Sequence, residues 1–156
     1  MIEMFLYNWQ IREEWFEWCG SLLNEELTRK RVGGMGSILH NLYHVVDCEQ
    51  IWINQLQGTP VQVNDLNAVT TLQEVMAFAA HTQSETLHFL QSLPMDGPEK
   101  VLELKRKDGS IKSLSYGKVL RHISAHEIHH IGQLSVWSRE IGLKPISSDL
   151  IFRELV

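Results

Sequence analysis

The sequence has little of what would point to a secreted, membrane-embedded or nucleic-acid-binding protein. It contains two cysteines, Cys19 and Cys48, which are too few for a disulfide framework, so we expect free thiols. No apolar run approaches the roughly 20 residues that a membrane-spanning helix needs. Glu3 stands where a secretory leader would carry basic residues. These absences together predict a cytoplasmic protein.

Positive charge is also scarce. The 14 lysines and arginines are outnumbered by 19 aspartates and glutamates, which gives a formal net charge of −5. Nucleic acids and anionic membranes favour basic surfaces, so we expect neither as a partner and expect a small-molecule substrate instead. The 156 residues, 44% of them hydrophobic, suit a single domain over 1–156 with a substantial core.

Hydrophobic periodicity predicts four long helices. Ser37 suits the N-cap of the second helix, and Thr71 with Glu74 forms the capping-box pattern of the third. Before the last helix, Asp108-Gly109 separates two β-prone segments, which predicts a small hairpin with a type I′ turn. The prediction is an all-α protein, an antiparallel four-helix bundle with this hairpin before its last helix. The expected helices run from Ile2 to about Thr28, from about Ile38 to Leu56, from Thr71 to about Leu93 and from Ser115 to about Ile141.

Histidines are concentrated in the last predicted helix, where four of the eight lie between His122 and His130. A helix turns by about 100° per residue, so His126 and His130 lie one turn apart on one face. Two imidazoles at that spacing can bind one divalent metal ion. Val119 and Trp137 fall on the same line, which indicates that this face points into the bundle. A buried imidazole without a partner is costly, and a metal ion provides one.

A third ligand is expected from another helix. His44 lies mid-helix among apolar neighbours and is the leading candidate, while His40 competes with it one turn earlier. The alternative for His44 is a hydrogen bond within the core. We interpret Cys48 as a small buried filler. The remaining histidines are expected beside the site or at the surface: His81, His88, His122 and His129.

Two blocks of the sequence resemble the DinB-like (DinB/YfiT-like) metal-binding family: residues 38–52, and residues 126–133, which read HEIHHIGQ. The resemblance implies a four-helix bundle in which His44, His126 and His130 hold one divalent ion, such as zinc or nickel. It also implies frequent homodimers, which suits the first two predicted helices, since each is apolar on two sides. Many members carry arginine where Ile131 stands. If that arginine helps to hold an anionic group, this chain holds the group differently or not at all.

Three protein ligands leave one position open, and that position sets the expected chemistry. A divalent ion lowers the pKa of bound water to about 7, which gives a nucleophile for hydrolysis, or it binds a thiol as the thiolate. The resemblance covers both, because family members include thiol-dependent transferases and isomerases, and others carry only the label of metal-dependent hydrolases. A low-molecular-weight thiol is therefore a candidate co-substrate. Glu127 and Asp47 are the candidate general bases.

Two alternatives compete with an enzyme of this kind. Residues 126–130 also match H-E-x-x-H, the zinc-protease motif in which the glutamate activates water, although no third metzincin-type histidine follows. The other alternative is a noncatalytic binding or stress-response module with a structural ion. A fourth protein ligand, such as Cys48 or His40, would favour the structural role, and an open position would favour the enzyme.

Overall fold

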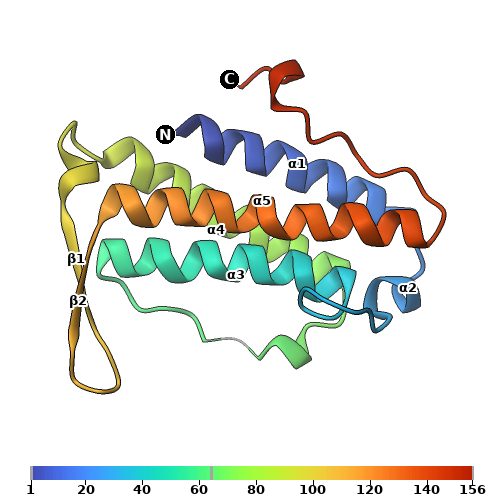
Figure 1. The fold of residues 1–156 in the computed structure, drawn as a ribbon, viewed down its shortest axis with the longest axis horizontal. Coiled ribbons are helices and arrows are strands. Elements are labelled where there is room, and N and C mark those ends of the chain that lie inside the picture. Colours follow the sequence, from blue (N-terminus) through green and yellow to red (C-terminus); the bar gives the residue numbers. More distant parts are fainter. Residues whose placement is uncertain (1, 64, 156) are drawn as a thin grey trace.

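Four long helices pack together in the computed structural model, which describes residues 2–63 and 65–155 (Figure 1). A two-stranded antiparallel hairpin precedes the last of them. The predicted helical bundle with a hairpin before its final helix is therefore confirmed. The long helices are α1 (Ile2–Gly20), α3 (Ile38–Gln57), α4 (Leu72–Ser92) and α5 (Tyr116–Glu140).

The direction of the helices follows from the colours in Figure 1. Helices α1 and α5 run in one direction, and α3 and α4 run in the other. Because α3 and α4 are neighbours in sequence and point the same way, the chain between them returns along the bundle. We call residues 58–63 and 65–71 the crossover; it contains the short 3-10 helix η1 (Leu66–Ala68). Gly58 begins it in the left-handed conformation, with φ of 72°.

The first predicted helix is interrupted, so its expected extension to about Thr28 is wrong. Helix α1 ends at Gly20, and a separate short helix, α2 (Asn24–Thr28), follows. The amides of Ser21 and Leu22 donate to carbonyl oxygens three residues back, a tightening that ends an α-helix. The two segments therefore pack at different angles and do not form one continuous rod.

The hairpin joins β1 (Val101–Lys105) to β2 (Ile111–Ser115). The predicted type I′ turn is wrong, because that turn needs positive φ at both central residues. Gly109 has φ of 83°, whereas no non-glycine residue in the described part of the chain has positive φ. The Gly109 amide donates to the Arg106 carbonyl oxygen at 3.0 Å. The connection is a type I turn followed by a left-handed glycine.

The predicted helix caps are confirmed. The Ser37 hydroxyl accepts a hydrogen bond from the His40 amide at 3.1 Å, and Thr71 with Glu74 forms the complete capping box. Each cap satisfies backbone donors at the start of a helix and contributes about 1 kcal/mol. The Ser37 cap fixes where α3 begins, and so fixes the register of the histidines on that helix.

The core consists of two apolar clusters separated along the bundle by a layer of buried polar side chains. One cluster is built around Ile11, Trp15 and Leu42, and the other around Phe5, Ile53 and Leu120. Between them lies what we call the polar layer: Arg12, Glu49 and Glu127, all buried. Within the described residues, no helix has the length and apolar character needed to cross a membrane.

Candidate metal centre

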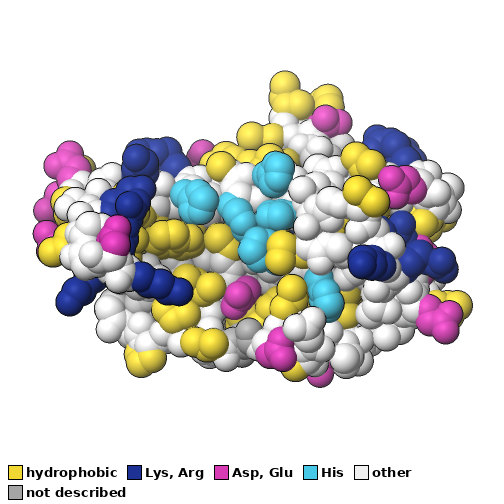
Figure 2. All heavy atoms as spheres, turned by 60° about the horizontal axis from the view of Figure 1, so that its bottom comes forward, with side chains coloured by type: hydrophobic (Ala, Val, Ile, Leu, Met, Phe, Trp, Pro, Cys, Tyr) yellow, Lys and Arg dark blue, Asp and Glu magenta, His cyan; other side chains and the backbone are white. Residues whose placement is uncertain are grey.

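Three histidines converge between α3 and α5. His126 and His130 lie one turn apart on α5, and His44 comes from α3. One ring nitrogen from each lies within 4.8 Å of the others, and the ring centroids are 4.5 to 4.8 Å apart. Histidine side chains gather near the middle of one face of the molecule (Figure 2). The predicted convergence of these three residues is confirmed.

The spacing of the ring nitrogens fits a shared cation. His44 Nε2 and His126 Nε2 are 3.1 Å apart. Two nitrogens that bind one tetrahedral zinc ion at about 2.0–2.1 Å lie roughly 3.3 Å from each other. At such a distance two nitrogen lone pairs repel unless a proton or a cation lies between them. The other ring nitrogen of His126, Nδ1, is buried and has no hydrogen-bond partner among the described residues.

The ring of His130 is held by two amide side chains. Its Nδ1 lies 3.1 Å from Asn41 Oδ1 and 2.8 Å from Gln133 Oε1, so Nδ1 carries the proton and Nε2 is free to bind a metal. Asn41 Nδ2 also donates to the His130 carbonyl oxygen at 2.9 Å. Asn41 is fully buried and ties α3 to α5 beside the site. Hydrophobic periodicity did not reveal that Asn41 holds the His130 ring. The signal for it in the sequence is an asparagine about one turn before His44 on the same helix.

A glycine turn leaves room for these amides. Gly34 has φ of 49°, and a Cβ added there would lie 2.7 Å from Asn41 Oδ1 and from Gln133 Oε1. Both oxygens are the acceptors of the His130 ring proton. A larger residue at this position would displace them, so Gly34 is required both by its backbone conformation and by the close approach.

Burial keeps the three imidazoles neutral. Burial, with a smaller contribution from the neighbouring rings of His130 and His44, lowers the pKa of His126 to about 4. Burial also lowers the pKa of His44, with His130 adding to this effect and Asp47 opposing it. The pKa of His130 is lowered by burial, while its hydrogen bond to Gln133 acts in the opposite direction. Neutral imidazole is the form that binds metal ions, so the environment prepares all three rings for that role.

Glu127 follows His126 in sequence, but its carboxylate contacts α1 from within the polar layer. Arg12 Nε and Nη2 donate to its two oxygens at 2.8 and 2.7 Å, and Arg12 Nη2 also donates to Glu49 Oε2 at 2.6 Å. Trp9 Nε1 lies 3.3 Å from both oxygens of Glu49. Burial raises the pKa of Glu127, and the Arg12 guanidinium opposes that shift. These contacts favour a structural role for Glu127; the general-base role stays a prediction.

The other candidate residues lie outside the cluster. Asp47 is half-buried, accepts a hydrogen bond from Gln50 Nε2 at 3.1 Å and acts on His44 through its charge. His40 and Cys48 do not belong to the group of converging ligand atoms. Cys48 is buried, and burial raises the pKa of its thiol to about 12, as expected for a filler. The remaining histidines, His81, His88, His122 and His129, are exposed as expected.

Comparison with known proteins places the chain in a family. The model of the DinB family matches residues 1–155. The chain belongs to the DinB family. It is also 38% identical over 155 residues to the uncharacterized protein YizA of Bacillus subtilis (strain 168), an alignment that covers 99% of this chain and 96% of that protein.

Within this DinB-family chain, Ile131 occupies a core position. It is buried and packs in the same apolar cluster as Leu134 and Trp137. Ile131, where the resemblance implied an arginine in many members, therefore faces the bundle interior.

Proposed function

We propose that this DinB-family protein binds one divalent metal ion through His44, His126 and His130 and uses it to activate a small-molecule substrate. The observation that carries the proposal is the convergence of three neutral imidazoles whose ligand atoms lie within 4.8 Å. A bound ion supplies Lewis acidity and a coordination position that the protein does not fill.

Further support comes from how the chain surrounds the cluster. No cysteine or carboxylate of the described residues joins the three histidines, and a three-ligand donor set supports a reactive centre over a structural one. His44 and His126 are partly exposed, which leaves a path for a small molecule. Asn41 and Gln133 fix the tautomer of His130, a task that such ligands commonly require of their neighbours.

Two reaction types fit this centre, and they differ in what they require of the protein. Transfer chemistry with a low-molecular-weight thiol needs only that the ion bind the sulfur as thiolate. Hydrolysis gains from a general base, and Asp47, beside His44, is the candidate for it. The contacts of Glu127 with Arg12 disfavour the H-E-x-x-H protease alternative, in which this carboxylate would face the ion.

Metal analysis of matched variants tests the proposal. We expect His126→Ala to lose the bound ion while most of the helicity remains, because the two apolar clusters lie on either side of the site. His81→Ala is the control, since His81 is exposed and outside the cluster. Calorimetric titration with a small thiol then distinguishes the reaction types, because only the metal-loaded chain should bind it if thiol transfer is correct. Retention of a full equivalent of metal by His126→Ala would refute the site.

A further inference from the structure

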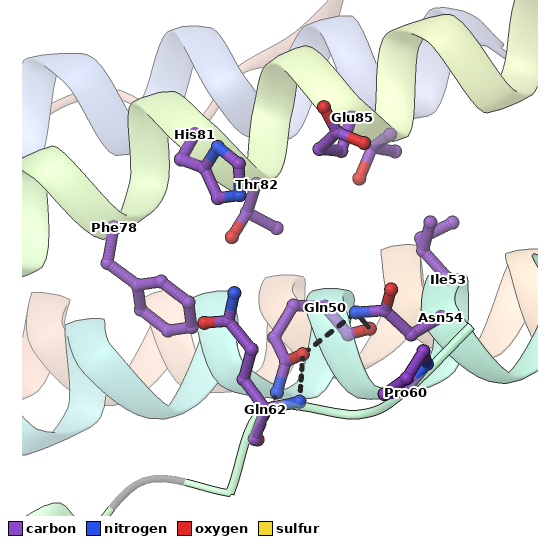
Figure 3. A pocket seen from close by; sticks show the side chains of 10 residues that line it. Gln50, Ile53, Asn54, Pro60, Gln62, Phe78, His81, Thr82 and Glu85 are labelled. Atoms are coloured by element: carbon purple, nitrogen blue, oxygen red, sulfur yellow. Dashed lines mark hydrogen bonds between the residues drawn. The ribbon is translucent and has the colours of Figure 1, made fainter.

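A cavity lies between α3 and α4, under the crossover. It encloses about 230 Å³, and none of the three converging histidines lines it. Figure 3 shows its walls: Ile53 and Asn54 come from α3, Phe78, Thr82 and Glu85 from α4, and Pro60 from the crossover. This cavity is separate from the metal centre and has no part in the function proposed above.

The polar side chains of the α3 wall are already hydrogen-bonded within the protein. Gln50 Nε2 donates to the Gln62 carbonyl oxygen at 2.9 Å, and Gln50 Oε1 accepts from Asn54 Nδ2 at 3.0 Å. Asn54 Oδ1 in turn accepts from the Thr59 hydroxyl at 2.6 Å. These bonds tie the crossover to α3 and satisfy the two amides. The wall is therefore rigid but has little capacity left for a ligand.

The α4 wall differs, because its polar groups have no partners. Thr82 is 3% exposed and Thr86 is 0% exposed, and neither hydroxyl has a hydrogen-bond partner among the described residues. In Figure 3 the Thr82 hydroxyl oxygen points into the cavity toward Gln50 and Gln62. An unsatisfied buried hydroxyl costs about 1–3 kcal/mol. Two of them, one turn apart on one cavity wall, mark a place where something else supplies the hydrogen bonds.

The charges around the cavity define what that ligand is. Its described lining includes the carboxylate of Glu85 and the imidazole of the exposed His81, and no lysine or arginine. Asp47 lies just beyond Gln50 and is hydrogen-bonded to it. An anion would meet the Glu85 carboxylate with no lysine or arginine to offset it, whereas an ammonium group would find Glu85 and two hydroxyl oxygens as acceptors. The ring of Phe78 adds a surface that also favours a cation.

We propose that this cavity binds a small aliphatic amine as its ammonium ion. The ammonium group donates to the Thr82 and Thr86 hydroxyls and to the Glu85 carboxylate, and its hydrocarbon part lies against Ile53 and Phe78. At roughly 30 Å³ per water molecule, about 230 Å³ corresponds to seven or eight waters, so the ligand is small. A compound of about six non-hydrogen atoms, such as butane-1,4-diamine, fits this volume.

The test is an NMR titration of the full chain with butane-1,4-diamine at pH 7.5. We expect saturable shifts of backbone amide signals in α4 and the crossover at concentrations up to about 10 mM. Butane-1,4-diol, which matches the diamine in size, and succinate, which is an anion, should give no saturable shift. Ordered water alone in the cavity would show as no saturable binding by the diamine, and equal binding of the diol would exclude the ammonium group; either result overturns the proposal.

Matched variants connect the binding to the residues named. Glu85→Gln should weaken the diamine affinity about tenfold, and Thr82→Val roughly fivefold. Thr82→Val removes an unpartnered hydroxyl at constant shape, so its melting temperature should be unchanged or higher, which separates a ligand site from a structural role. Ser84→Ala, an exposed neighbour outside the lining, should bind as the parent does. His126→Ala should also bind the diamine as the parent does. A result against the proposed metal site would therefore leave the proposed amine site untouched, and the reverse holds as well. Unaltered affinity in both Glu85→Gln and Thr82→Val would exclude this site.

Discussion

At the scale of single residues, the centre depends on side chains whose burial suppresses their charge. His44, His126 and His130 are neutral because ionised imidazoles would be poorly solvated between α3 and α5. Their positions follow from helical spacing and could be predicted from sequence. Of the two amides that hold His130, Gln133 is also within helical reach on α5, but the role of Asn41 could not be predicted, because Asn41 lies far from His130 in the chain and meets it only after the helices pack.

The lowered pKa values predict how the metal-free protein responds to acid. In the unfolded chain a histidine binds its proton near pH 6.5, whereas in the folded chain the pKa of His126 is about 4. Between these values the unfolded state binds more protons, so the free energy of unfolding falls as the pH falls. We expect this contribution to be fully present above about pH 6.5 and progressively lost toward pH 4.

Melting curves measured in chelator between pH 7.5 and 4.5 check this prediction. His126→Gln removes one of the groups that must take up a proton on unfolding, so its melting temperature should fall less steeply with acidification. His81→Gln, altered at an exposed site, serves as the control. Identical slopes for the parent and His126→Gln would show that His126 does not contribute.

At the scale of elements, the polar layer joins three helices behind the metal centre. Arg12 from α1 reaches Glu49 on α3 and Glu127 on α5, and Glu127 is the sequence neighbour of His126. Sequence patterns predicted each helix because periodicity is local. They did not predict this layer, since residues 12, 49 and 127 are brought together only by the fold. The break after Gly20 was missed for a related reason: apolar spacing continues through the region where the backbone turns.

Removing the central cation of this layer should be strongly destabilising. Arg12→Met leaves two buried carboxylates without a countercharge, which predicts a loss of about 3–5 kcal/mol in the free energy of unfolding. Replacing the whole layer, with Arg12→Met, Glu49→Leu and Glu127→Met together, should recover most of the lost free energy of unfolding, because no buried charge then remains. Denaturant unfolding measures both effects, and a single Arg12→Met variant as stable as the parent would contradict the prediction.

At the scale of the whole molecule, the predicted homodimer has a candidate surface. An exposed row of small and apolar residues follows α5 on the side away from the core: Ala125, Ile128, Gly132 and Val136. Ile128 is 41% exposed and Val136 56% exposed, and Met4 of α1 borders the row near Ala125. A second copy of the chain that covers this row would also bury Met4, which gives α1 the outer contact that its two-sided apolar pattern predicts.

Light scattering on the purified chain tests the homodimer. We expect a mass near twice that of the 18.0 kDa chain, and Val136→Glu should shift it toward the single-chain value by placing a charge in the contact. Ile111→Glu is the matched control, because Ile111 is equally apolar and exposed but lies on the hairpin. A monomeric parent, or dissociation by Ile111→Glu alone, would speak against this surface.

The contacts of Arg12 also limit how the centre can be transplanted. A designer who grafts the three histidines onto another pair of helices would copy the metal-binding side chains. The graft would omit the Arg12 guanidinium, which links both helices to a third. The recipient protein would then need another buried interaction behind the imidazoles to keep the two helices in register. The smallest portable version of this site is consequently a three-helix unit.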